Sequence, residues 1–139
     1  MLACQAVAWA LMKPEHNSSL SKLAVQKTGL GNAADKTRKN HNKTLGLLRD
    51  LKAVTAFGHV EDNAETGLPT YLRPKGVIAS MVPSTNPLAQ PAHNIINALK
   101  RGNVIIIAPS PTGVEPFAPL LHFIYPTPLT TCLTPYLIQ

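Results

Sequence analysis

The chain has 139 residues, enough to bury the core of one modest domain. Hydrophobic residues make up 45% and charged residues 14%, which favours an ordered chain over a disordered basic tail. The net charge of +6 permits an anionic partner without naming one. Two distant cysteines, Cys4 and Cys132, give no disulfide framework, so a reducing, cytoplasmic location is expected.

The start of the chain predicts a helix rather than an export signal. A helix from about Leu2 to Met12 would bury Val7, Leu11 and part of Trp9. An export signal needs basic residues ahead of its apolar run, and no Lys or Arg precedes that run here. Elsewhere Pro and His interrupt the apolar stretches before they reach the length of a membrane span. We therefore expect no membrane partner.

Two more helices are expected before residue 52. One begins at Pro14, and Gly29 would close it in the left-handed conformation. The next runs from Ala33 to Leu51 and includes a basic cluster, Lys36 to Lys43. The cluster lacks the interleaved aromatic residues that stack on bases, so a solvated helix face is favoured over a nucleic-acid site. Three leucines are expected on the apolar face of this helix: Leu45, Leu48 and Leu51.

A β-hairpin is expected over residues 53–75. Apolar and β-branched residues alternate on both sides of a polar turn at Asp62 to Gly67. A hairpin by itself is only marginally stable, which favours a partner surface. The acidic residues around the turn have no His or Cys at ligand spacing, so no metal site is expected.

The stretch from Gly76 to Pro111 predicts a strand, a helix and a second strand. Val77–Val82 and Val104–Ala108 are short apolar runs without polar alternation, which is typical of strands buried on both faces of a parallel sheet. Between them lies a helix from Pro87 to Arg101, closed by Gly102. Its apolar residues recur at three- and four-residue steps: Ala92, Ile95, Ile96 and Leu99.

A polar loop joins the first of these strands to the helix. Ser84, Thr85 or Asn86 can cap the helix, while Pro87 occupies a first-turn position that needs no N–H. In parallel sheets, ligands bind at the carboxyl ends of the strands. The same rule places the loop Pro83–Pro87 and the segment Ala108–Pro111 on one rim of the sheet.

These motifs carry a resemblance. GVIASMVPSTNP, followed by a helix and then NVIIIAPSP, resembles the start of the nucleotide-binding domain of the aldehyde dehydrogenase superfamily. More narrowly, it resembles the coenzyme A-acylating branch, which includes acetaldehyde and sulfoacetaldehyde dehydrogenases. The upstream segments TGLGNAADKTRKNHNKTLGLLRDL and TYLRPKGV are similar to segments of that branch. The resemblance covers roughly Val7 to Thr112.

The resemblance implies an α/β fold with N-terminal helices, a β-hairpin and the first βαβ unit of a doubly wound, Rossmann-like sheet that is incomplete. It implies NAD or NADP as cofactor, coenzyme A as co-substrate, a small-molecule aldehyde as substrate, and no metal. In relatives the hairpin belongs to a projecting segment used in oligomer contacts, so a homo-oligomer is expected. Neither nucleic acid nor membrane is implied as a partner.

The resemblance also implies roles for the loop residues. In the family this loop approaches the nicotinamide and the thioester centre, so Asn86, or Thr85 if the loop aligns without a gap, would support the oxyanion. The alternative that both residues only cap the following helix stays open. Many non-acylating members have Lys where this chain has Ala108, and Ser110 would replace its ribose contact. The implied cofactor-binding residues are Pro83, Ser84, Thr85, Pro109 and Ser110.

Two features set the chain apart from the family. The chemistry needs a cysteine nucleophile, and neither Cys4 nor Cys132 lies in the family's cysteine motif, so we expect the isolated chain to be inactive. The start is clipped relative to relatives, and residues 114–139 contain prolines where the family continues with a helix: Pro116, Pro119, Pro126, Pro128 and Pro135. Because proline at that density breaks helices, we expect an aberrant tail, disordered or frame-shifted.

The expected organisation has four parts: a helical segment (1–52), an oligomerisation-type hairpin (53–75), a partial nucleotide-binding βαβ unit (76–113) and the aberrant tail (114–139). The leading hypothesis is a fragment of an NAD(P)-dependent, coenzyme A-acylating aldehyde dehydrogenase. The alternative is a noncatalytic remnant that binds partners or nucleotide through the hairpin and the basic helices.

Overall fold

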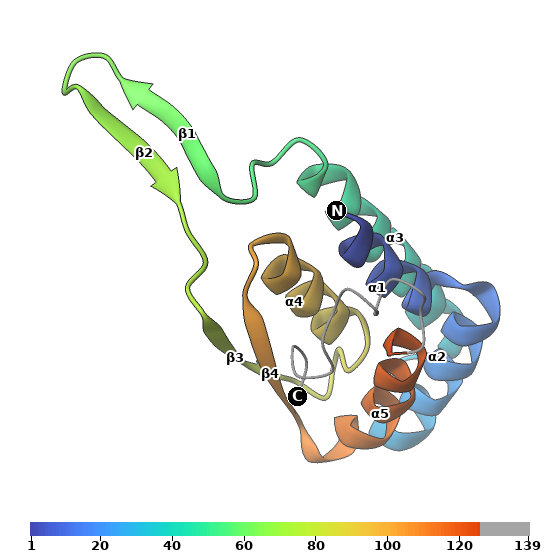
Figure 1. The fold of residues 1–139 in the computed structure, drawn as a ribbon. Coiled ribbons are helices and arrows are strands. Elements are labelled where there is room, and N and C mark those ends of the chain that lie inside the picture. The colour runs from blue at the N-terminus through green and yellow to red at the C-terminus, as the bar shows by residue number, and fades with distance from the viewer. Residues whose placement is uncertain (126–139) are drawn as a thin grey trace.

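The computed structural model describes residues 1–125, and the elements follow one another as Figure 1 shows. The helices are α1 (Leu2–Met12), α2 (Pro14–Thr28), α3 (Ala33–Leu51), α4 (Ala89–Lys100) and α5 (Val114–Ile124), with a 3-10 turn η1 (Pro111–Gly113) before α5. The strands are β1 (Gly58–Asn63), β2 (Leu68–Leu72), β3 (Val77–Val82) and β4 (Val104–Pro109). The described part therefore has the mixed α/β architecture expected from the sequence.

The three N-terminal helices are confirmed at their predicted bounds. Pro14 is the first residue of α2, where a missing N–H disturbs no intrahelical bond. α2 ends at Gly29, whose φ of 67° lies in the left-handed region that favours glycine. The side chain of Asn32 caps α3, because its Oδ1 accepts from the Asp35 amide at 2.8 Å. Trp9, predicted to bury part of its ring, is 60% exposed.

The buried face of α3 differs from the predicted one. Leu45 is 50% exposed, whereas Lys36, Asn40 and Thr44 are buried. These three residues lie four positions apart and therefore form one stripe along the helix. Leu48 and Leu51 pack only at the border of the core. The physical reason is that α2 presents polar side chains to this stripe, so hydrogen bonds decide which face turns inward.

Amide side chains join α2 to α3. Asn40 Nδ2 donates to Asn17 Oδ1 at 3.0 Å and to Ser21 Oγ at 3.2 Å. Asn17 Nδ2 in turn donates to the carbonyl of Thr37 at 2.9 Å. Asn17, Ser21 and Asn40 are all buried, so each lost bond would leave a desolvated polar group.

β3 and β4 pair in parallel, and α4 connects them along the chain. The pairing runs from Val77 opposite Val104 to Val82 opposite Pro109. Asn103 positions the start of β3, since its Oδ1 accepts from the amides of Lys75 and Gly76 at 2.6 and 3.1 Å. The predicted strand–helix–strand unit is confirmed. The predicted end of its helix is also confirmed, because Gly102 follows the helix with a φ of 68°, in the left-handed region.

Two expectations about this unit are wrong. Among the described residues nothing covers the outer face of the two-stranded sheet, so Val77 and Ile106 are exposed and Met81 is 88% exposed. α4 covers only the opposite face, which holds Ile105 and Ile107. The N-cap of α4 is Leu88, with no side-chain cap, because residues 83–86 form a separate turn in which Asn86 N donates to the carbonyl of Pro83.

The expected disorder after residue 113 is wrong for α5. Pro116 lies in the first turn of this helix, where its missing N–H has no intrahelical partner to lose. Pro119 lies inside the helix and removes one bond, and burial of Phe117, Leu120 and Ile124 offsets that loss. The expectation for residues 126–139 concerns residues outside the described part.

One apolar core unites the helices with the β3–α4–β4 unit. Residues of α1, α2, β3, α4, β4 and α5 belong to the same buried cluster. The hairpin of β1 and β2 stands away from this body, and Figure 1 shows it projecting beyond α3. Within residues 1–125, none of the helices is both long and apolar enough to cross a membrane.

The amide contact between α2 and α3 leads to a stability prediction. Asn40→Ala should lower the free energy of unfolding by about 2 kcal/mol, because Asn17 and Ser21 lose a buried donor. Asn42→Ala, at an exposed position of the same helix, should change it by less than about 0.5 kcal/mol. Urea denaturation measures both, and equal effects would contradict the structural role of Asn40.

Candidate functional site

The loop Pro83–Pro87 and the end of β4 meet at one rim, as predicted. Ser110 N donates to the carbonyl of Val82 at 2.9 Å. Gly113 is buried beneath both segments, because a Cβ added there would lie 2.9 Å from Ser110 Oγ and 3.4 Å from Pro87 Cβ. Only glycine leaves room for this close approach. The two predicted segments therefore form one continuous surface.

Two polar atoms at this rim are enclosed without a hydrogen-bond partner: Asn86 Oδ1 and Ser110 Oγ. Buried polar atoms in folded proteins almost always have a partner, so each unpaired one requires an explanation. A ligand that enters at the rim would satisfy Asn86 Oδ1 by donating to it, because this oxygen only accepts, and it would satisfy the Ser110 hydroxyl by donating or accepting. The rim thus has the side chains expected of a small-molecule site.

The remaining predicted residues surround this pair with different exposures. Pro83 and Thr85 are exposed, whereas Ser84 and Pro109 are half-buried. None of the side chains from 84 to 86 caps α4. Helix capping therefore does not account for Asn86, and its role at the rim stays a prediction.

Thr85 faces a pocket that sequence reasoning missed. This pocket has a volume of about 230 Å³. Its other walls come from the α2–α3 turn and the first half of α3: Leu30, Gly31, Asn32, Asp35, Lys36 and Lys39. Six of the seven lining residues lie between Leu30 and Lys39, but the seventh, Thr85, is distant in sequence, so no local motif signals the complete pocket. The one sequence feature that falls in the pocket is the basic cluster beginning at Lys36, for which the sequence favours a solvated helix face.

Lys36 is the unusual residue of this pocket. It is only 7% exposed, and no hydrogen bond or ion pair reaches its side chain from the described residues. Its Cε lies over the turn, 3.8 Å from the place of a Cβ at Gly31. Burial, and then the nearby Lys39 ammonium, lower the pKa of Lys36. The stem of Lys36 is therefore enclosed, whereas its Nζ is not among the fully enclosed, unpartnered polar atoms of the described residues.

Cys4 is unsuited to act as a nucleophile. It is 1% exposed on α1, and its Sγ donates to the carbonyl of Ile96 at 3.6 Å. Burial raises the pKa of its thiol, and the raising effect exceeds the opposing effects of the N-terminal amine and Lys100. Reactive cysteines show the reverse, a lowered pKa and partial exposure. Cys132 lies outside the described residues.

Two further observations limit what residues 1–125 can do. They contain no cluster of three or more His, Cys, Asp or Glu side chains that could hold a metal ion. A larger pocket of about 650 Å³ lies between α2 and α3, and none of the predicted site residues lines it. We therefore place the candidate site at the rim rather than in this larger pocket.

Comparison with known proteins tests the resemblance. A sulfoacetaldehyde dehydrogenase (acylating) from Cupriavidus necator is 54% identical over 123 residues, which cover 88% of this chain and 25% of the relative. The resemblance to coenzyme A-acylating aldehyde dehydrogenases is confirmed. The chain spans about a quarter of the length of these curated relatives. No protein-family model matches the chain.

Solved structures of similar proteins confirm the fold. An acetylating aldehyde dehydrogenase from Geobacillus thermoglucosidasius superposes with a TM-score of 0.83 at 25% identity and covers 97% of this chain and 30% of its own. An engineered glycolyl-CoA reductase with bound NADP+ gives a TM-score of 0.72 at 25% identity, covering 88% of this chain and 27% of its own. The described helices and strands therefore have the architecture of part of an acylating aldehyde dehydrogenase.

The unpaired ammonium of Lys36 leads to a second stability prediction. Lys36→Met should raise the free energy of unfolding at neutral pH by up to about 1 kcal/mol, because it keeps the packing of the stem and removes a partly desolvated charge. The gain should shrink as the pH rises from the lowered pKa of folded Lys36 to the ordinary lysine pKa. In that range the unfolded wild type binds more protons than the folded one, so the wild type becomes more stable.

Urea denaturation at several pH values measures this difference. Lys43→Met removes an exposed charge from the same helix and serves as the control, with an expected change of less than about 0.5 kcal/mol. A Lys36→Met variant that is less stable than wild type at neutral pH would show that the ammonium is not an unpaired charge.

Proposed function

We propose that the chain supplies part of the nucleotide site of an NAD(P)-dependent, coenzyme A-acylating aldehyde dehydrogenase. Such an enzyme is an oxidoreductase that converts an aldehyde, coenzyme A and NAD(P)+ to an acyl-CoA and NAD(P)H. The observation that carries the proposal is the pair of enclosed, unpartnered atoms, Asn86 Oδ1 and Ser110 Oγ, on one rim. The names of the acylating relatives support the reaction type.

The rim residues would have distinct roles. The Asn86 side-chain amide, with Thr85 beside it, would donate a hydrogen bond to the aldehyde oxygen as negative charge develops there. The Ser110 hydroxyl would contact the ribose of the adenosine, with the backbone of Pro109 alongside. Pro83 and Ser84 would form the wall next to the nicotinamide. When bound, the nicotinamide accepts a hydride from the substrate.

The nucleophile of this proposal lies outside residues 1–125. Cys4 is the cysteine of the described part, and its burial and raised pKa disfavour the thiolate that attacks an aldehyde. The described residues would therefore bind and orient cofactor and substrate without forming the thioester themselves. We accordingly propose that residues 1–125 do not catalyse the reaction alone.

The projecting hairpin is the proposed contact with a second copy of the chain. Every residue of β1 is exposed, and β2 is exposed except for a half-buried Leu72. An isolated two-stranded hairpin is marginally stable in water, so a partner that adds strands or covers one face would stabilise it. We place this assembly in the cytoplasm, because the cysteine content gives no sign of an oxidising compartment.

The nucleotide proposal predicts a measurable loss of affinity. Isothermal titration of the full chain with NAD+ and NADP+ should show binding of at least one of them. Ser110→Ala should weaken that binding about fivefold, the effect of one lost hydrogen bond. Ser19→Ala, at an exposed position on α2, should leave the affinity unchanged. Unaltered affinity of Ser110→Ala, or no binding of either nucleotide, would contradict the proposed site.

A further inference from the structure

Two pockets lie along one face of α3. The first, of about 650 Å³, is lined on α3 by residues between Ala33 and Asn42, and the second, of about 410 Å³, by residues between Leu45 and Lys52. Their α3 residues share one side of the helix, because they recur at three- and four-residue steps. They include Ala34, Thr37, His41, Leu45, Leu48 and Lys52. The pockets are thus consecutive parts of one groove, the α3 groove, along a helix of 19 residues, or about 28 Å.

The other wall of the α3 groove comes from α1 and the start of α2. Met1 and Gln5 line the second pocket, and Met12 and Pro14 line the first. Trp9 follows Gln5 by one turn of α1, so it lies on the same side of that helix, between the two pockets, and it is 60% exposed. Gln5 is the one strongly polar residue of α1. A helix that is apolar on all sides is normally covered on all sides, so its outward side suits a partner.

The α3 groove is lined by basic side chains and by no acidic one. Lys22 and Arg38 line the first pocket, Arg49 and Lys52 line the second, and neither lining contains Asp or Glu. Within residues 1–125, no ion pair involves Lys22 or Lys52. A partner that presents carboxylates would therefore complement the charge of this groove.

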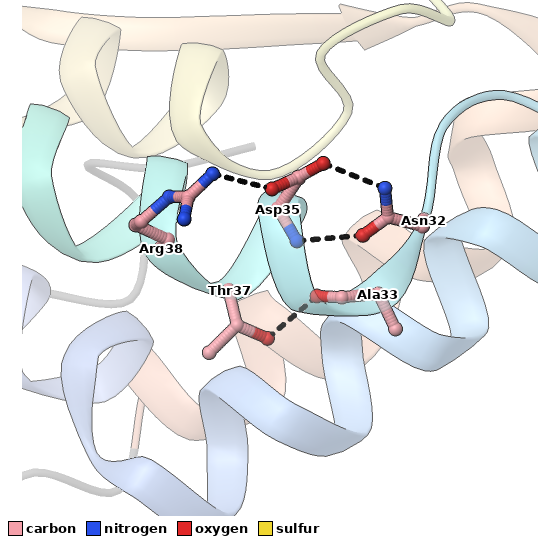
Figure 2. Close-up of polar contacts among 5 residues, drawn as sticks. All are labelled: Asn32, Ala33, Asp35, Thr37 and Arg38. Carbon is pink, nitrogen blue, oxygen red and sulfur yellow. Dashed lines mark hydrogen bonds and ion pairs between the residues drawn. The ribbon is translucent and has the colours of Figure 1, made fainter.

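The two arginines of the groove are paired with carboxylates of α3 outside it. Figure 2 shows Arg38, whose Nη2 lies 2.5 Å from Asp35 Oδ1. Arg49 Nη2 lies 2.9 Å from Asp50 Oδ1. All four side chains are more than half exposed, and exposed pairs of this kind contribute little to stability. Carboxylates of a partner could therefore share both guanidinium groups without disrupting a strong internal contact.

We propose that the α3 groove binds an acidic amphipathic helix of a partner protein. The apolar side of that helix would cover Trp9 and Leu45, and its Glu and Asp residues would meet Lys22 and Lys52. The length of the groove suits a helix of several turns rather than a small molecule. Its apolar residues line pockets, so they suit an inserted helix better than a flat membrane surface. The interaction is independent of the proposed nucleotide site, because no residue of the rim lines either pocket.

The test uses the full chain and a tryptophan-free synthetic peptide of about 18 residues, which matches the length of α3. The peptide carries leucine at three- and four-residue steps and glutamate on both flanks of that stripe. Trp9 is the single tryptophan of the chain, so a blue shift of its emission reports cover at the groove. Isothermal titration should give a micromolar dissociation constant that rises with ionic strength. A peptide with lysine in place of each glutamate, and one of the same composition with evenly spread leucines, should not bind.

Substitutions separate the apolar and the charged contributions. Trp9→Ala should weaken peptide binding at least about tenfold, because tryptophans are frequent hot spots of interfaces. Lys22→Glu and Lys52→Glu should each weaken it at least about threefold and reduce its salt dependence. Tyr71→Ala, an exposed aromatic of the hairpin, and Lys43→Glu, exposed on the other side of α3, should bind as wild type does. Circular dichroism establishes that each variant is folded.

Several results would overturn the proposal. They are absence of binding of the acidic peptide, equal binding of either control peptide, and unchanged affinity in Trp9→Ala. A blue shift on vesicles of phosphatidylcholine and phosphatidylserine, without binding of the acidic peptide, would assign the groove to a membrane surface instead. Sedimentation of the wild-type chain as a dimer and of Trp9→Ala as a monomer would assign it to a second copy of the chain, and this result also overturns the proposal.

Discussion

The burial of α4 between the two-stranded sheet and α1 is the interaction on which the rest of the structure depends. Ile95 and Ile96 are fully enclosed, and Cys4 of α1 contacts the carbonyl of Ile96. Full burial of one such side chain contributes about 1.5–3 kcal/mol. Since α4 also follows the loop Pro83–Pro87 directly, its packing fixes where the rim lies. The helical segment and the strand–helix–strand unit are therefore one body with one core.

Much of the fold could be predicted from the sequence because its signals are local. Proline at the start of α2 and glycines after α2 and α4 mark helix ends through backbone conformation alone. The apolar runs of β3 and β4 and the spacing of α4 likewise identify the strand–helix–strand unit. These features need no knowledge of what packs against them.

The predictions that were wrong or missing all concern features that depend on tertiary packing. The inward face of α3 follows the amides of α2 rather than its leucines, so Leu45 is exposed. Met81 is exposed because the described residues provide no cover for that face of the sheet, although its strand has the composition of a buried one. The proline inside α5 costs a backbone hydrogen bond, and the burial of the neighbouring apolar side chains in the core offsets that loss. The pocket of Lys36 and Thr85 joins residues from distant elements, which no motif could reveal.

The rim and the pocket show how stability and function compete in this chain. Enclosed polar atoms at Asn86 and Ser110 and the partly desolvated charge of Lys36 each weaken the folded state. Functional sites commonly carry such unfavourable groups, because a ligand satisfies what the fold leaves unpaired. Two of the four enclosed, unpartnered atoms of the described residues, Asn86 Oδ1 and Ser110 Oγ, lie at the rim, whereas Thr44 Oγ1 and His93 Nε2 lie on α3 and α4. The pair at the rim is the reason for placing the ligand there and not in the larger pocket between α2 and α3.

The most direct test of this account is a crystal structure of the full chain soaked with NAD+ or NADP+. The account predicts electron density for the nucleotide along the rim, with Ser110 Oγ within hydrogen-bond distance of the adenosine ribose and the nicotinamide toward Asn86. Nucleotide density in the pocket between α2 and α3, with the rim empty, would contradict it.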